Sequence, residues 1–239
     1  MSRNLIVANR LPVTVHKKGT RVVLRSSPGG LATGMASLGG AQENRWIGWA
    51  GRAAEELSAQ ERDRITRDLQ QSNYYPLFLS RSEVDDYYHG FCNKTIWPLF
   101  HYFALYTVYE NRYWQAYRRV NETFAEAVLE AAGPEDRIWI QDYQLMLLPA
   151  LLRAQLPRAR IGFFLHIPFP SYELFRLLPW RTEILGGLLG ADLIGFHTYD
   201  YVRHFLSSVN RLCEVEHHLG KIFVGDRLVQ VDAFPMGID

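Results

Sequence analysis

The sequence has few cysteines and no excess of charge of either sign, and both absences exclude classes of protein. Its 239 residues include two cysteines, Cys92 and Cys213, with no CxxC spacing, so neither a disulfide framework nor a cysteine zinc site is supported. The 26 Lys and Arg residues against 25 Asp and Glu residues leave a formal charge of +1. Such a balance favours neither a nucleic-acid-binding surface nor a basic membrane patch. We therefore expect no nucleic-acid partner.

Long apolar runs are also missing. The first apolar run, Leu5 to Ala8, is too short for the core of a signal peptide. No later run reaches the roughly 20 residues of a membrane span. At 48% hydrophobic and 21% charged residues, the chain still has enough apolar side chains for a sizeable core. The composition predicts a cytoplasmic globular protein with no membrane partner.

Strand-like and helix-like segments alternate along the chain. Short apolar runs predict strands at 5–8, 46–49, 75–79, 137–140, 161–166, 193–196 and 228–233, and a hairpin of 13–15 with 21–24. Periodicity and capping residues predict helices at 31–38, 58–71 (N-cap Ser58), 82–97 (N-cap Ser82), 111–132, 144–155, 172–190 and 199–213. This alternation predicts an α/β fold with a doubly wound, mostly parallel, Rossmann-like sheet. Since no linker or repeat interrupts it, residues 1–239 are expected to form one domain.

Ligands of open α/β sheets bind beyond the carboxyl ends of the strands, so polar residues after the apolar runs are the first candidates for a site. Arg10 follows the first run, and its planar guanidinium suits a phosphate group. A surface salt bridge is the alternative for Arg10. Asp142 follows the run at 137–140 and could accept hydrogen bonds from sugar hydroxyls or orient a base. Its alternative is an N-cap for the next helix.

His166 ends another apolar run and precedes Pro168 and Pro170, which restrict the following turn and hold the imidazole in place. Nothing nearby in the sequence completes a catalytic triad or a metal site, and a satisfied core histidine is the alternative. The adjacent His217 and His218 point apart in any regular structure, so they make a poor metal pair. The sequence predicts no metal site and no cofactor.

Two further segments contain candidate ligand contacts. Gly29 and Gly30 precede a helix-like stretch, where backbone N–H groups can approach phosphate oxygens. Their spacing is neither GxGxxG nor GxxxxGK[ST], so a plain turn is the alternative. Tyr88 and Trp97 belong to a segment rich in aromatic residues, whose rings could stack on sugar faces. Most rings of that segment are expected to pack in the core.

Seven segments occur in an order that resembles the trehalose-6-phosphate synthase family. They are Ala8–Pro12, Gly29–Leu31, Trp46–Gly51, Tyr87–Tyr102 with its Tyr-Tyr, Trp-Pro and His-Tyr pairs, Trp139–Tyr143, Phe163–Pro170 and Pro235–Asp239. The resemblance covers the whole chain. It implies the N-terminal half of a two-domain GT-B glycosyltransferase that transfers glucose, with retention, from UDP-glucose to glucose 6-phosphate. The implied mechanism is front-face attack, with the leaving phosphate helping to take the proton.

The resemblance also implies roles for the candidate residues. The acceptor glucose 6-phosphate would be bound by Arg10, Tyr88, Trp97, Asp142 and Trp49. The donor UDP-glucose would be approached by Gly29, Gly30 and His166, and His166 and Asp142 would be the catalytic residues. The chain departs from many members at Gln141 and Gln144, where His is common, and at Tyr172. These departures affect the hydrogen bonding around Asp142 and the loop after His166.

The family has a second half that makes most nucleotide contacts, and the sequence stops where the first half leads into it. We therefore expect an acceptor-side domain over 1–239 that lacks the C-terminal nucleotide-sugar domain, is inactive alone, and could form a homo-oligomer. Two alternatives stay open. One is a glucosyltransferase of the same family with another phosphorylated acceptor, such as glycerol 3-phosphate. The other is a non-catalytic regulatory or binding subunit.

Overall fold

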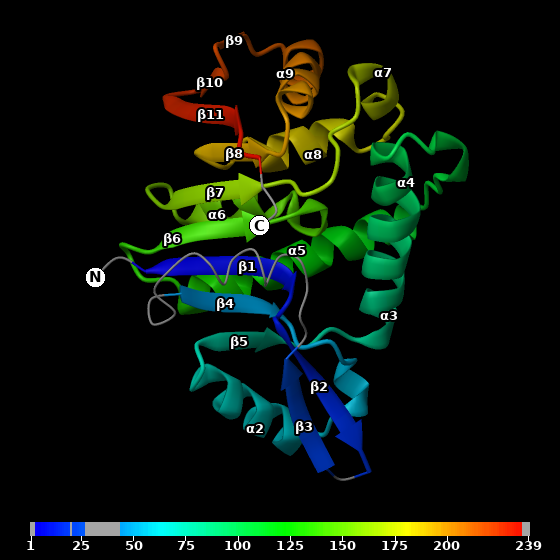
Figure 1. Cartoon of the computed structure of the whole chain (residues 1–239), viewed down its shortest axis with the longest axis vertical. Coiled ribbons are helices and arrows are strands. Elements are labelled where there is room, and N and C mark those ends of the chain that lie inside the picture. The colour runs from blue at the N-terminus through cyan, green and yellow to red at the C-terminus, as the bar shows by residue number, and fades with distance from the viewer. Residues whose placement is uncertain (1–2, 20, 27–43, 236–239) are drawn as a thin grey trace.

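A computed structural model describes residues 3–19, 21–26 and 44–235 of the chain (Figure 1). The strands are β1 (Asn4–Arg10), β2 (Val13–Lys18), β3 (Arg21–Ser26), β4 (Asn44–Trp49), β5 (Tyr74–Leu77), β6 (Arg137–Gln141), β7 (Arg160–Phe164), β8 (Leu193–Phe196), β9 (His217–His218), β10 (Lys221–Val224) and β11 (Arg227–Ala233). The α-helices are α2 (Ala59–Gln70), α3 (Arg81–Glu83), α4 (Trp97–Phe100), α5 (Asn111–Ala131), α6 (Leu148–Gln155), α7 (Tyr172–Phe175), α8 (Arg181–Leu188) and α9 (Tyr199–Cys213). A π-helix, η2 (Val84–Ile96), and three 3₁₀ turns, η1 (Ala54–Glu56), η3 (Ala104–Tyr106) and η4 (Tyr143–Leu145), complete the described elements.

The larger of the two described sheets has the strand order β5-β4-β1-β6-β7-β8-β11-β10-β9. Neighbours from β5 to β11 pair in parallel, whereas β10 pairs antiparallel with both β11 and β9. The chain moves from β1 outward to β5, returns to β6 beside β1, and continues in the other direction. The order therefore reverses between β1 and β6, which confirms the predicted α/β class and locates the crevice that such sheets use for ligands.

Helices α5, α6 and α8 lie along one face of this sheet (Figure 1). Apolar side chains of the strands and of these helices form one large buried cluster, with Phe163, Phe124 and Leu185 among its least exposed members. A smaller cluster lies under the β2–β3 hairpin and includes Leu11 and Ile65. No described helix is both long enough and apolar enough to cross a bilayer.

Helix capping confirms one sequence prediction and corrects another. Ser58 caps α2 in a capping box, since its Oγ accepts from the Glu61 N–H at 3.2 Å and its own N–H donates to Glu61 Oε2 at 2.7 Å. The predicted N-cap Ser82 is wrong, because Ser80 makes the same reciprocal bonds with Glu83. The reason is visible in the spacing. Ser80 has Glu three residues later, whereas Ser82 has the shorter Asp85, which is not a capping-box partner.

Three other boundaries differ from the prediction. The expected helix at 172–190 is two helices, α7 and α8, because Pro179 between them has no N–H to donate and restricts the residue before it. The expected helix at 144–155 begins with the 3₁₀ turn η4 before α6. The short antiparallel strands β9 and β10 were not predicted at all. The helix predicted at 31–38 lies outside the described residues.

Candidate active site

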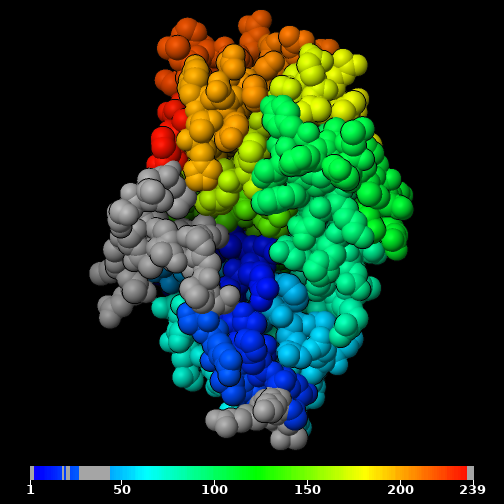
Figure 2. All heavy atoms as spheres, turned by 45° about the vertical axis from the view of Figure 1, so that its right-hand side comes forward, coloured from blue at the N-terminus to red at the C-terminus, as the bar shows by residue number. Residues whose placement is uncertain are grey.

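The candidate residues gather at the carboxyl ends of neighbouring strands. Arg10 ends β1, Asp142 follows β6 and His166 follows β7. Because β1 and β6 pair directly, Arg10 and Asp142 flank the point where the strand order reverses. Figure 2 turns this edge of the sheet toward the viewer, and the dark blue end of β1 lies recessed beside the green segment from α3 to α4. The fold thus brings together residues that are far apart in the sequence.

The Arg10 side chain is exposed and is held by contacts with Thr14 and Trp49. Its Nη2 donates to Thr14 Oγ1 at 3.2 Å, and its guanidinium carbon lies 5.2 Å from the centre of the Trp49 ring. The Trp49 side chain is buried, and its Nε1 donates to the Arg52 carbonyl at 3.0 Å, which orients the ring under the guanidinium. The salt bridge considered for Arg10 is not formed with any described carboxylate. Its positive charge is therefore available to an anionic ligand.

Gly51 makes room for this arrangement. Its φ of +83° lies in the left-handed region that glycine adopts easily, and a Cβ at this position would overlap Arg10 Nη2. Gly51 ends the Trp46–Gly51 segment, and the sequence alone predicts no role for it. The signal for that role is three-dimensional, because the overlap depends on the path of β1 against β4.

Asp142 has an unusual backbone and an unusual partner. Its φ of 73° and ψ of 172° lie in a region that is nearly restricted to glycine, so the residue is held there at a cost of about 1–3 kcal/mol. Asp142 occupies the N-cap position of η4, but its side chain makes no capping hydrogen bond there, so the expected side-chain cap is not formed. Oδ1 instead accepts from the backbone N–H of His166 at 3.0 Å. One strand end is thereby tied to the next.

The charge of Asp142 is not compensated by a described cation. Burial raises the pKa of its carboxyl group from 3.8 to about 6, although hydrogen bonds from the His166 and Tyr143 N–H groups act in the opposite direction. At neutral pH the carboxylate is ionised and its negative charge is only partly stabilised. A group in this condition gains from a ligand that donates hydrogen bonds, which is typical of functional carboxylates.

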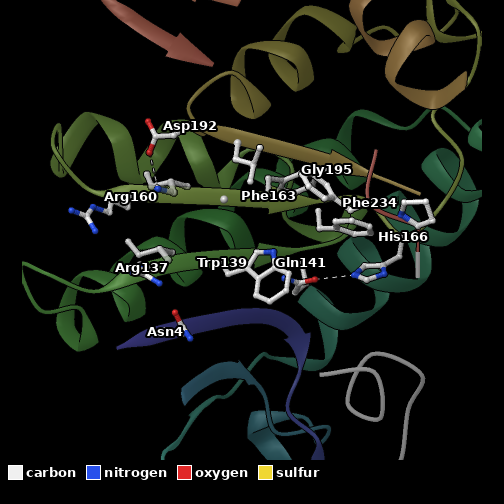
Figure 3. A pocket seen from close by; sticks show the side chains of 16 residues that line it. Asn4, Arg137, Trp139, Gln141, Arg160, Phe163, His166, Asp192, Gly195 and Phe234 are labelled. Carbon is white, nitrogen blue, oxygen red and sulfur yellow. Dashed lines mark hydrogen bonds between the residues drawn. The ribbon is translucent and has the colours of Figure 1, made fainter. Parts of the chain in front are cut away.

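The imidazole of His166 is held by Gln141. His166 Nε2 lies 2.8 Å from Gln141 Oε1, and Figure 3 shows this bond at one end of a cavity of about 670 Å³ on the sheet face. The cavity is mostly apolar, with Trp139 and Phe234 among its lining residues. Gln141 and His166 are the candidate residues that reach it, whereas Arg10 and Asp142 lie beyond its lining.

His166 stays neutral at physiological pH. Burial lowers the pKa of its imidazole to about 4, and the nearby His197, whose ring centre is 5.5 Å away, opposes a second positive charge. The ring of Phe164, 4.7 Å away, adds to its apolar surroundings. A neutral imidazole can both donate and accept hydrogen bonds, so His166 suits a sugar hydroxyl better than a phosphate.

The π-helix η2 explains the placement of two aromatic residues. Tyr88 and Trp97 are nine residues apart, which puts them on opposite sides of an α-helix with 3.6 residues per turn. The wider turns of a π-helix, roughly four to five residues each, return such a pair to the same side. Both residues then lie near Tyr143. The centres of the Trp97 and Tyr143 rings are 5.7 Å apart. Burial is the main cause that raises the pKa of the Tyr143 phenol, and Tyr88 is one of the neighbours that add to it. Sequence analysis did not predict this π-helix.

The two aromatic side chains differ in how they are held. Trp97 is 44% exposed and stacks on His101 with 4.0 Å between ring centres. Tyr88 is half-buried against the main core. An exposed, braced indole ring is available for a sugar face, and Tyr88 presents a smaller part of its ring.

Some predicted features cannot be placed. Gly29 and Gly30 lie outside the described residues, so their donor-binding role stays a prediction. Within residues 3–19, 21–26 and 44–235, no group of three or more His, Cys, Asp or Glu side chains is arranged to hold a metal ion.

The chain is similar to several known proteins in sequence and in fold. A bifunctional trehalose-6-phosphate synthase/phosphatase from Thermoproteus tenax is 48% identical over 99% of the chain, which spans 33% of that relative. The N-terminal domain of a Candida albicans trehalose-6-phosphate phosphatase has a TM-score of 0.84 at 31% identity, covering 100% of this chain and 49% of that one. A Burkholderia xenovorans trehalose-phosphate synthase in complex with glucose-6-phosphate has a TM-score of 0.77 at 29% identity, covering 99% and 50%.

These relatives are longer proteins. The chain spans about a third of some relatives and about half of others, and it matches the N-terminal half of the trehalose-phosphate synthases. Its sheet is the one found in the N-terminal half of GT-B trehalose-phosphate synthases. The sequence model of the family described as "Glycosyltransferase family 20" matches residues 2–239, and the chain therefore belongs to glycosyltransferase family 20.

Proposed function

We propose that this chain forms the acceptor side of a retaining glucosyltransferase that transfers glucose from UDP-glucose to glucose 6-phosphate. The observation that supports it most is the pair of uncompensated groups at the strand-order reversal. The Arg10 guanidinium is exposed without a described carboxylate partner, and the Asp142 carboxylate is desolvated without a described cation. A sugar phosphate supplies both missing partners, an anion for Arg10 and hydroxyl donors for Asp142.

Relatives support the identity of the substrates. A relative from Pichia angusta that is 45% identical is named as a UDP-forming trehalose-phosphate synthase, and the structural neighbour from B. xenovorans contains glucose-6-phosphate. In the proposed complex, Arg10 holds the phosphate and Trp97 and Tyr88 contact the acceptor sugar. Trp49 acts beneath Arg10, since its own indole N–H is already occupied. Gly29, Gly30 and His166 face the donor.

The proposed chemistry follows from these positions. An acceptor hydroxyl oxygen bonds to the anomeric carbon on the face from which UDP departs, and its proton passes to the leaving phosphate. Ionised Asp142 accepts hydrogen bonds from the acceptor and orients it, while neutral His166 binds a hydroxyl of the transferred glucose. Orientation of both sugars is the main contribution that these residues can make.

We propose that residues 1–239 act as one acceptor-binding domain and that the partner is the remaining half present in the longer relatives. The experiment also tests two alternative functions. One is another phosphorylated acceptor such as glycerol 3-phosphate, which Arg10 would also bind. The other is a non-catalytic role, and it gains weight from the structural neighbour named as the N-terminal domain of a phosphatase. A cytoplasmic location and a homo-oligomer stay predictions.

The test compares this chain with a polypeptide that fuses it to the C-terminal half of the P. angusta relative, of which the chain spans 51%. UDP release is measured with UDP-glucose and either glucose 6-phosphate or glycerol 3-phosphate, and acceptor binding to the chain alone is measured by calorimetry. We expect transfer to glucose 6-phosphate by the fusion, none by the chain alone, and binding of glucose 6-phosphate by both. Preference for glycerol 3-phosphate would replace the acceptor. Absence of any acceptor binding by the chain would contradict the proposal.

A further inference from the structure

The contact between Gln141 and His166 joins the last residue of β6 to the second residue after β7. Gln141 is 1% exposed, and its Oε1 lies 2.8 Å from His166 Nε2. Gln141 and the next residue, Asp142, thus hold His166 twice, once at the imidazole and once at the backbone N–H. The imidazole has a fixed orientation at the end of the cavity (Figure 3).

This contact determines which ring nitrogen bears the proton. A neutral imidazole has one N–H, and the amide oxygen of a glutamine can only accept a hydrogen bond. The proton must then be on Nε2, which leaves Nδ1 with a free lone pair. Among the described residues, Nδ1 has no hydrogen-bond partner.

We propose that Gln141 is a positioning residue that keeps His166 in the Nε2–H tautomer, so that Nδ1 serves as a hydrogen-bond acceptor for a hydroxyl of the transferred sugar. The tautomer follows from the orientation of the Gln141 amide, whose Oε1 faces His166 Nε2. The identity of the hydroxyl rests on the proposed function. Gln141 itself need not touch either substrate.

The surroundings of His166 leave this assignment to Gln141. The titratable neighbours are His197, with ring centres 5.5 Å apart, and Asp142, whose Oδ1 is engaged with the His166 backbone N–H. Neither makes a hydrogen bond to the imidazole nitrogens. Phe164 contributes only an apolar ring face. A side chain that replaces the Gln141 oxygen should therefore release the tautomer without another group taking over.

The cost of the arrangement is visible at the other end of the same amide. Gln141 Nε2 is buried and has no hydrogen-bond partner among the described residues. A buried unpaired amide is uncommon and frequently marks a functional constraint. Turning the amide around would place Nε2 against His166 and would force the proton onto Nδ1. The two orientations thus predict opposite tautomers, which makes the proposal measurable.

The test uses the 239-residue chain without ligand, labelled with ¹⁵N at histidine. Long-range ¹H–¹⁵N correlation spectra at pH 7.5 distinguish the two tautomers, and the His166→Ala variant assigns the signal. We expect His166 to show a protonated Nε2 and an unprotonated Nδ1. A protonated Nδ1 in the wild-type chain would overturn the proposal.

Three variants separate positioning from general packing. Gln141→Leu removes the acceptor, and we expect the His166 signals to change to a mixture of both tautomers. Gln141→Glu keeps an obligate acceptor, so the Nε2–H tautomer should persist, while the added negative charge raises the pKa of His166 by at least one unit. Gln144→Leu is the matched control and should leave the His166 signals unchanged. If Gln141→Leu does not fold, Gln141→Glu still decides. An unchanged tautomer in Gln141→Leu, or an unchanged pKa of His166 in Gln141→Glu, would contradict the proposal.

A kinetic readout in the fusion protein connects the tautomer to transfer. Residues that orient a metal-bound imidazole typically affect activity by about tenfold to a hundredfold, and we expect an effect at the lower end of that range for Gln141. We expect Gln141→Leu to lower kcat by about tenfold with little change in the KM for glucose 6-phosphate, and Gln141→Glu to recover part of that loss. If the spectra show the expected tautomer and no fusion transfers glucose, the proposed function fails and the tautomer assignment stands. If the fusion transfers glucose while His166 carries its proton on Nδ1, the proposed function stands and the tautomer assignment fails.

Discussion

Asp136 and Asp142 lie at opposite ends of the same strand, β6, and have opposite electrostatic properties. At the amino end, burial alone would raise the pKa of Asp136, but hydrogen bonds from the Gly133 N–H and from Arg3 outweigh it and lower the pKa. Arg3 approaches through its backbone N–H, Nε and Nη2 at 3.2–3.3 Å. At the carboxyl end, burial raises the pKa of Asp142 to about 6 because no described cation compensates it.

The same contrast holds along the two edges of the sheet. At the amino edge, the Asp192 carboxylate accepts hydrogen bonds from Arg153 Nη2 at 2.6 Å and from the Ile161 N–H at 2.8 Å. Its charge is therefore compensated within the protein. At the carboxyl edge, Arg10 and Asp142 have no described partner of opposite charge. Compensated charges stabilise the protein, whereas uncompensated ones are available to a ligand. The uncompensated charges therefore lie at the carboxyl edge, where we propose that the substrates bind.

If the carboxyl edge binds the substrates, the largest effect there is expected for His166→Ala in a fusion that transfers glucose. Loss of a preorganised polar contact to the reacting sugar typically costs about 2.7–4 kcal/mol, so kcat should fall by about a hundredfold to a thousandfold. The KM of either substrate should change less. Steady-state kinetics measure both.

His204→Ala is the matched control for that variant. His204 Nδ1 bonds to the Phe169 carbonyl at 3.0 Å and lies in α9, away from the candidate residues. It should lower the melting temperature with near-normal kcat per folded molecule. If His166→Ala behaves in the same way, His166 is a structural histidine.

Arg10→Ala tests the uncompensated cation. Loss of a charge-assisted phosphate contact should cost about 1.5–3 kcal/mol, or roughly one to two decades in kcat/KM for glucose 6-phosphate. The KM for UDP-glucose should change less. Arg52→Ala is the control, since Arg52 is already engaged with Glu56 and the Val15 carbonyl. An acceptor kcat/KM that is equal in both variants would remove Arg10 from the site.

Exchange of each β6 aspartate for asparagine should have opposite effects on the stability of the 239-residue chain at pH 7.5. Asp136→Asn weakens charge-assisted bonds and should reduce the free energy of unfolding by about 1–3 kcal/mol. Asp142→Asn removes a poorly compensated charge and should increase it by about 1–3 kcal/mol. At roughly 2–4 °C per kcal/mol, melting curves resolve the difference. Destabilisation by both variants would break the comparison.

The pH dependence gives the smallest effect. The folded-state pKa of Asp142 is raised above its ordinary value of 3.8, so its contribution to stability is fully present below about pH 4 and is lost as pH rises through 6. The melting temperature of Asp142→Asn should therefore exceed that of the wild type at pH 7.5, and the two should converge near pH 4. A constant difference across this range would mean that a property of the asparagine side chain other than its lack of charge is responsible.

Sequence patterns predicted the strands and helices that position the site. Apolar runs ending in Arg10, Asp142 and His166 predicted residues at one edge of a parallel sheet, since that inference needs only strand direction. Contacts across strands could not be predicted in this way. The Gln141–His166 bond depends on the register of β6 against β7, and the space above Gly51 depends on the path of β1.

The break at Pro179 and the cap at Ser80 were accessible from the sequence with closer attention to local rules. The π-helix η2 was not, because the energy difference between α and π turns over 84–96 is decided by packing against α5 and η4 rather than by local propensity. The backbone of Asp142 was equally hidden. Its positive φ is imposed by neighbouring strands on a residue that would not adopt it alone.

The π-helix has a consequence for insertions and deletions. In η2 the length of the segment, and not only its residues, sets the angle between Tyr88 and Trp97. If one residue between them were deleted and the segment rewound in α form, Trp97 would lie about 80° around the helix axis from Tyr88, since eight residues at roughly 100° each turn by about 800°. Every aromatic side chain would survive such a deletion unchanged in identity. A residue-by-residue comparison of aligned sequences would therefore miss this change. The number of residues between Tyr88 and Trp97 should be compared before the identity of the residues.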